Sequence, residues 1–179
     1  ASRHPEGHVH PAQHGRPGPH WREIPTDVQS ASNEPGSQKG DDPAEDARNW
    51  DMSQVRQLCH ETLDQLRKAT RPVIMAGTGV RASGAMDEFE RVIRKLGIPV
   101  TPAWTQDLIA ADDELFCGRP GTIGERAGNF TVQNADVLLI LGSRLNIRQV
   151  SYNWASFARE AFKIQVDVDA AELKKPTIQ

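Results

Sequence analysis

The order of apolar and polar positions divides the chain near Trp50. Beyond that point apolar residues recur every three or four positions, a spacing that is typical of a helix packing one face on a core. The first such helix is predicted from Val55, Leu58, Cys59, Thr62, Leu63 and Leu66. Thr70-Arg71-Pro72 ends it, because the residue before a proline is disfavoured in helical backbone.

Short apolar runs alternate with the predicted helices. Residues 73–76 form a continuous apolar run, as expected of a strand that is covered on both faces. The other expected elements are helices at 85–96, 125–134 and 150–161 and strands at 98–101, 137–141 and 162–168. This alternation predicts an α/β fold, namely a doubly wound, Rossmann-like parallel sheet of about six strands with helices on both faces.

Residues 1–50 have a different composition. Five of the six histidines and seven of the twelve prolines lie there, without an apolar period, so this part is not expected to form a core. After a turn, a short strand-like stretch is predicted over residues 21–28. Residues 30–45 are rich in Ser, Gly, Pro and Asp, as is typical of a linker. We therefore predict a tail at 1–50 and one folded domain at 51–179.

Charge and hydropathy argue against several classes of protein. The chain has 21 basic and 24 acidic residues without a long run of either sign, so neither nucleic acid nor a membrane surface is an expected partner. The longest apolar stretch, residues 137–142, is far shorter than the ~20 residues of a membrane helix, and no signal peptide is recognisable. A cytoplasmic protein is predicted. Cys59 and Cys117 have no CxxC partner, so no disulfide framework or zinc site is expected.

The loops after the strands are where such a sheet binds ligands. Gly77-Thr78-Gly79-Val80-Arg81-Ala82 fits G-x-G-x-x-A between a strand and a helix, where glycines allow a diphosphate to approach the backbone. The same glycines also suit a plain strand-to-helix turn. No carboxylate follows the second strand at Val100-Thr101-Pro102-Ala103, where a ribose clamp would stand, which disfavours ordinary NAD binding.

Three later loops add charged candidates. Arg119 lies in a glycine-rich turn, and Arg144 follows the strand ending at Leu141, where a guanidinium suits phosphate. Asp167, or Asp169 beside it, follows the last strand and suits a ribose or amine hydrogen bond. A solvated arginine, a salt bridge at the rim and a helix cap are the respective alternatives. The predicted cofactor-binding residues are Gly77, Thr78, Gly79, Val80, Arg119, Arg144 and Asp167, with no catalytic or metal-binding residue.

Taken in order, these loops resemble the middle domain of thiamine-diphosphate-dependent enzymes of the acetolactate synthase type. The resemblance rests on residues 71–79, 118–121, 134–144 and 166–169, and it covers the chain from Asp51 to its end. Its most specific piece is Ala-Asp-Val-Leu-Leu-Ile-Leu-Gly-Ser-Arg, which ends at Arg144. The tail, over residues 16–29, is similar to the exit of the preceding pyrimidine-binding domain.

The resemblance implies a parent enzyme that decarboxylates or joins 2-oxo acids with thiamine diphosphate and magnesium. That cofactor is bound between the pyrimidine- and diphosphate-binding domains, which are the implied partners together with further copies in a homo-oligomer. The family holds its metal with a Gly-Asp-Gly motif that this chain lacks, and its activating glutamate belongs to the first domain, so Glu23 is not that residue. The chain alone is therefore not expected to be catalytic.

FAD is the other cofactor that the resemblance implies, because some members hold it in this domain. Gly77, Gly79, Arg144 and Asp167 match the positions of that site, whereas Arg119-Pro120 departs from the histidine-containing pattern of flavin binders. The sequence leaves open a structural or a nucleotide-binding role for the domain. A freestanding Rossmann-like nucleotide-binding protein and a structural interaction domain are the alternatives.

Overall fold

The computed structural model describes residues 23–32, 34, 36, 50–105 and 107–175. The chain divides into two units, Ala1–Asp51 and Met52–Gln179. In the first unit, helix α2 covers Thr26–Gln29, so the strand-like stretch predicted over residues 21–28 is wrong at its end. Pro25 sets the φ angle from which this single turn starts, and the Gln29 side chain donates a hydrogen bond back to the Ile24 carbonyl (2.7 Å). Trp21 lies outside the described residues.

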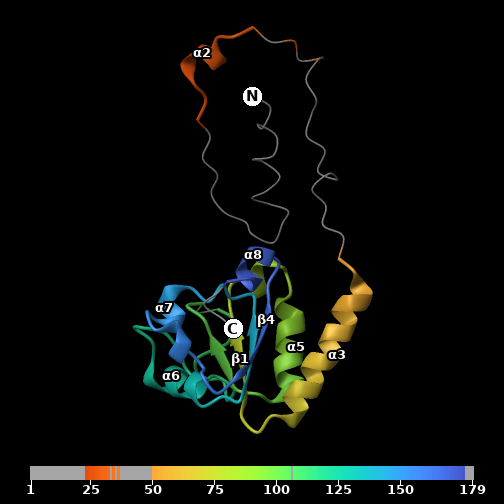
Figure 1. The fold of residues 1–179 in the computed structure, drawn as a ribbon, viewed down its shortest axis with the longest axis vertical. Helices are drawn as coiled ribbons and strands as arrows, with labels where there is room; N and C mark the ends of the chain where they lie inside the picture. The colour runs from red at the N-terminus through yellow and green to blue at the C-terminus, as the bar shows by residue number, and fades with distance from the viewer. Residues whose placement is uncertain (1–22, 33, 35, 37–49, 106, 176–179) are drawn as a thin grey trace. The chain divides into compact units, whose positions relative to one another are not determined.

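The second unit is built on a parallel sheet of four strands (Figure 1). The strands are β1 (Pro72–Ala76), β2 (Val100–Pro102), β3 (Val137–Leu141) and β4 (Phe162–Val166), in the order β2-β1-β3-β4. The chain moves outward from β1 to β2, returns beside β1 as β3, and continues outward to β4. The doubly wound parallel sheet is thereby confirmed with four strands in the described part of the chain, and the count of about six is not.

Helices cover both faces of the sheet, as predicted. They are α3 (Met52–Lys68), α4 (Gly79–Ala82), α5 (Met86–Leu96), α6 (Arg126–Gln133), α7 (Ile147–Val150), the 3-10 helix η2 (Trp154–Ser156) and α8 (Ala170–Leu173). On one face, Ile74 of β1 packs in a cluster with Leu66 of α3 and Phe89 of α5. On the other, Met75 packs with residues of α6 and α7, including Val132. Alternate side chains of β1 thus pack into two different hydrophobic cores, one on each face of the sheet.

Two predicted elements differ from the structure. The helix expected at residues 150–161 is replaced by α7 and η2, because Ser151 (φ 66°) and Ala158 (φ 43°) adopt left-handed backbone that interrupts a helix. The second strand begins at Val100 rather than at residue 98. The end of α5 is as predicted, since Gly97 has φ 61°, the left-handed conformation that commonly terminates helices.

Asp136 joins the starts of the strands. Its carboxylate accepts hydrogen bonds from the Thr70 amide (2.7 Å), the Thr70 hydroxyl (2.6 Å) and the Arg71 amide (2.9 Å), just before β1. Its carbonyl accepts from the Phe162 amide (2.8 Å) at the start of β4. The Thr70 hydroxyl is the largest cause that lowers the pKa of Asp136, to about 2. Asp136 therefore aligns β1, β3 and β4 in register.

Asp136→Asn should lower the stability of the protein at neutral pH, because an amide is a weaker acceptor and its NH2 group opposes the Thr70 and Arg71 donors. Since the folded pKa of about 2 lies below the ordinary 3.8, the stabilisation is fully present above the ordinary value and is lost as pH falls through about 2. Urea midpoints at pH 6 should be lower for the variant than for wild type, and the gap should close toward pH 2. Asp112→Asn, at an exposed position, is the control; a gap that is independent of pH would contradict this role.

Candidate functional site

The loops after β1 and β3 meet at the point where the strand order reverses. The Gly77 amide donates to the Leu141 carbonyl (2.8 Å), and the Gly79 amide donates to the Gly142 carbonyl (2.9 Å). A Cβ on Gly77 would lie 2.4 Å from the Gly142 oxygen, and one on Gly79 would lie 2.6 Å from the Gly142 Cα. Glycine is therefore required for backbone contact between the two loops. We call Gly77, Gly79 and Gly142 the glycine interlock.

The interlock determines which backbone amides of the predicted glycine motif can donate hydrogen bonds to a ligand. Besides Gly77 and Gly79, the Val80 amide also donates within the domain, to the Gly77 carbonyl (3.2 Å), and the Val80 side chain is buried in the core. Thr78 is exposed at the tip of the loop. The motif lies where the sequence predicted, but three of its amides are engaged by backbone carbonyls of the protein.

Arg144 follows the interlock and pairs with α8. Its Nε donates to the Glu172 carboxylate (2.7 Å), which is buried, while the arginine side chain is 65% exposed. Lys175 forms an ion pair with the same carboxylate and donates to the Arg144 carbonyl (2.9 Å). Burial alone would raise the pKa of Glu172, but the hydrogen bonds from Lys175 and Arg144 outweigh burial and lower the pKa. This cluster attaches α8 to the β3 loop.

The two aspartates after β4 shape the start of α8. The Asp167 carboxylate accepts from the Asp169 amide (2.8 Å), and the Asp169 carboxylate accepts from the Ala171 amide (2.9 Å). The helix-cap alternative thus describes Asp169, which is the N-cap of α8. Asp167 stabilises the turn that leads into this cap.

Arg119 also has partners within the domain. It donates to Glu125 (3.1 Å), and its guanidinium lies 5.0 Å from the centre of the Phe116 ring. In the same loop, the Gly121 amide donates to the Asn129 side-chain oxygen (2.9 Å), and the Asn129 side-chain nitrogen donates to the Gly121 carbonyl (3.1 Å). The loop is held against α6 by these contacts.

Several of these partners were not predicted. Glu172 and Lys175 have only their i, i+3 spacing as a sequence signal. Trp104 and Arg148 come from loops far apart in sequence, yet the Arg148 guanidinium lies 5.6 Å from the Trp104 ring. No local pattern could have paired them.

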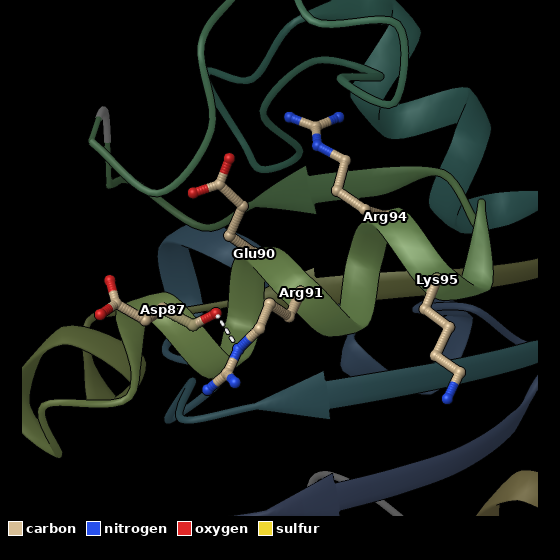
Figure 2. A pocket seen from close by; sticks show the side chains of 5 residues that line it. All are labelled: Asp87, Glu90, Arg91, Arg94 and Lys95. Carbon is tan, nitrogen blue, oxygen red and sulfur yellow. Dashed lines mark hydrogen bonds between the residues drawn. The ribbon is translucent and has the colours of Figure 1, made fainter.

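A shallow hollow on α5 lies apart from these loops. Figure 2 shows its charged side chains, Asp87, Glu90, Arg91, Arg94 and Lys95, extending from the helix without converging on one point. Arg94 donates to Asp113 (2.9 Å), a contact that is the largest cause lowering the pKa of that carboxyl, to about 2. We interpret the hollow as a solvated helix face.

Neither a metal-binding cluster nor a membrane-spanning helix is found in the described part of the chain. No group of three or more His, Cys, Asp or Glu side chains there is arranged to hold a metal ion. No helix in the same residues has the length and apolar character needed to cross a membrane. The histidines at positions 4, 8, 10, 14 and 20 lie outside the described residues.

Comparison with known proteins gives one family. The model described as "Thiamine pyrophosphate enzyme, central domain" matches residues 59–178. The chain is 34% identical over 167 residues to the acetolactate synthase large subunit of Lactococcus lactis subsp. lactis (strain IL1403), covering 92% of the chain and 28% of that protein. It is 32% identical over 165 residues to the acetolactate synthase isozyme 1 large subunit of Escherichia coli (strain K12), with the same coverage. Acetolactate synthase 1, chloroplastic, of Zea mays is 33% identical over 165 residues, 92% of the chain and 25% of that protein. The chain thus spans little more than a quarter of the length of these relatives.

Gly77→Ala should destabilise the domain by at least about 2 kcal/mol, because the new methyl group would overlap the Gly142 carbonyl and force the β1 and β3 loops apart. Chemical denaturation measures the loss. Gly36→Ala is the matched control, since a Cβ there meets nothing within 4 Å. Equal stability of the two variants would show that the loops are not in close contact.

Proposed function

This chain belongs to the family of thiamine pyrophosphate enzyme central domains, as the loop resemblance predicted, and we propose that it is a non-catalytic scaffold within an acetolactate synthase-type enzyme. The parent enzyme would decarboxylate a 2-oxo acid and join the product to a second one. The activity is proposed for the parent only, because this chain matches 28% of each of two acetolactate synthase large subunits.

One observation carries the scaffold role: the loops at the carboxyl edge of the sheet bind one another. Gly77 and Gly79 are bonded to the β3 loop, and Arg144 is bonded to α8 through Glu172. At this edge a Rossmann-like sheet ordinarily presents free amides and cations to its ligand. Here the same groups stabilise the domain itself.

The cofactors of the parent follow from the family. We propose that thiamine diphosphate and magnesium are bound by the pyrimidine- and diphosphate-binding domains of the parent, which are the partners of this domain. We assign residues 1–50 to the connection from the pyrimidine-binding domain and residues 51–179 to the central domain. A sheet of about six strands, homo-oligomeric assembly and a cytoplasmic location remain part of the proposal.

FAD binding is the second candidate role, and the residues fit it only in part. The exposed guanidinium of Arg144 favours an anionic ligand, since Glu172 accepts a hydrogen bond from Nε while the arginine side chain stays 65% exposed. The glycine loop does not fit a diphosphate as the motif predicts, because the Gly77, Gly79 and Val80 amides already donate to carbonyls. We therefore place the scaffold role first.

The 179-residue chain should not turn over pyruvate in the presence of thiamine diphosphate and magnesium, because it contains neither the Gly-Asp-Gly metal motif nor the activating glutamate of the first domain. Acetolactate formation measures this, with the Lactococcus lactis large subunit as the positive control. Turnover by the chain alone would overturn the non-catalytic assignment.

Calorimetry with FAD, ADP and NAD distinguishes the scaffold from a nucleotide site. We expect no binding heat with any of the three, because the amides of the glycine loop are engaged. Binding of FAD that weakens by ~1.5 to 3 kcal/mol in Arg144→Ala, as for loss of a charged hydrogen bond, would favour the second role. Arg159→Ala, which removes an exposed arginine paired with Glu160, is the control.

A further inference from the structure

Helix α8 is attached to the domain by charge rather than by apolar packing. Of its residues, Ala170–Leu173, only Glu172 is buried, and Leu173 is 47% exposed. A helix in a folded protein is ordinarily stabilised by a buried apolar face, and a single helical turn is unstable alone. The docked position of α8 therefore depends on the Glu172 carboxylate.

The Glu172 carboxylate gives one oxygen to each of two cations. Its Oε1 accepts from Arg144 Nε (2.7 Å), and its Oε2 pairs with Lys175. Lys175 lies beyond the end of α8 and donates separately to the Arg144 carbonyl (2.9 Å). The two cations are thus held near each other by a hydrogen bond that does not involve Glu172.

Burial gives this carboxylate two alternative states. Removing a carboxylate from water is costly, and the cost is offset only while its cations stay paired with it. The Glu172 side chain is 5% exposed, whereas the Arg144 side chain is 65% exposed and open to a dissolved ion. An ion that pairs more strongly with Arg144 and Lys175 would release Glu172 to water.

The turn that precedes α8 has hydrogen bonds of its own. The Asp167 carboxylate accepts from the Asp169 amide (2.8 Å), and the Asp169 carboxylate accepts from the Ala171 amide (2.9 Å). Neither bond involves Glu172 or Arg144. Release of Glu172 would therefore detach α8 while the chain stays anchored at the end of β4.

We propose that Glu172 makes an autoinhibitory contact: it occupies a two-cation site, formed by Arg144 and Lys175, that binds a phosphate-bearing anion when α8 is released. A phosphate group has more oxygens and more negative charge than a carboxylate, so it can bridge both cations and displace Glu172. Binding of the anion and docking of α8 then exclude each other. This inference goes beyond the scaffold role and does not depend on the reaction of the parent enzyme.

Calorimetry with inorganic pyrophosphate tests the competition in the 179-residue chain. Glu172→Gln should bind pyrophosphate at least about tenfold more tightly than wild type, because the neutral amide no longer competes for the cations. Adding Arg144→Ala to this variant should abolish the gain. A purely structural role of Glu172 would leave the affinity unchanged or lower it.

Glu160→Gln is the matched control, because it removes the same negative charge from an exposed carboxylate that pairs with Arg159. Its affinity for pyrophosphate should equal that of wild type. Equal affinity of wild type and Glu172→Gln, or a gain that survives Arg144→Ala, would overturn the proposal. So would the absence of pyrophosphate binding by all of these proteins.

Hydrogen exchange of the wild-type chain gives a measurement that needs no variant. The amides of residues 172–174 donate hydrogen bonds within the turn of α8, and at saturating pyrophosphate they should exchange at least about threefold faster, because the released turn opens more often. Sodium chloride at the same ionic strength should have less effect, since it screens the charges but does not bridge them. Residues 137–141, in the interior of the sheet, are the internal control. Unchanged or slower exchange of residues 172–174 would show that the anion and the docked helix coexist, which contradicts the autoinhibitory contact.

Discussion

Close backbone contact between β1 and β3 is the constraint on which the domain depends. These are the two central strands of the sheet, and different interactions hold them together at their amino and carboxyl ends. At the start, the Asp136 carboxylate binds the amides of Thr70 and Arg71. At the carboxyl end, the glycine interlock brings the two loops into direct contact. Both cores are then assembled from the alternating side chains of these strands.

The same constraint supports the scaffold role that we propose for this Rossmann-like edge. Amides that would otherwise face a phosphate are needed to hold the β1 and β3 loops together. Arg144, next along the chain, attaches α8 through the buried carboxylate of Glu172. The groups that the sequence marks as ligand-binding are thus used to connect successive strands and helices of one domain.

Local signals predicted most elements of the fold, but not which distant residues contact the loops of the candidate site. The apolar run of β3 and the Gly97 end of α5 depend on neighbouring residues, and both were predictable. The left-handed backbone of Ser151 and Ala158, which replaces a helix, has no signature in residue type. The G-x-G-x-x-A motif located the right loop but not its partner, because a glycine required by a ligand and one required by another loop look alike in sequence. Glu172 was missed because its partner Arg144 is 28 positions away.

The position of Asp136 also bears on how the domain folds. Thr70 and Asp136 are separated by 66 positions, so their hydrogen bonds form only when the chain between them has closed a loop of that length. Closing a loop of that length costs chain entropy before any contact compensates it, and non-local parallel pairing is slow for this reason. Folding of the sheet should therefore be limited by the meeting of β1 and β3, while α3 and α5 form early from local contacts. During that interval the apolar strand β3 is unpaired, which makes it the segment most exposed to aggregation.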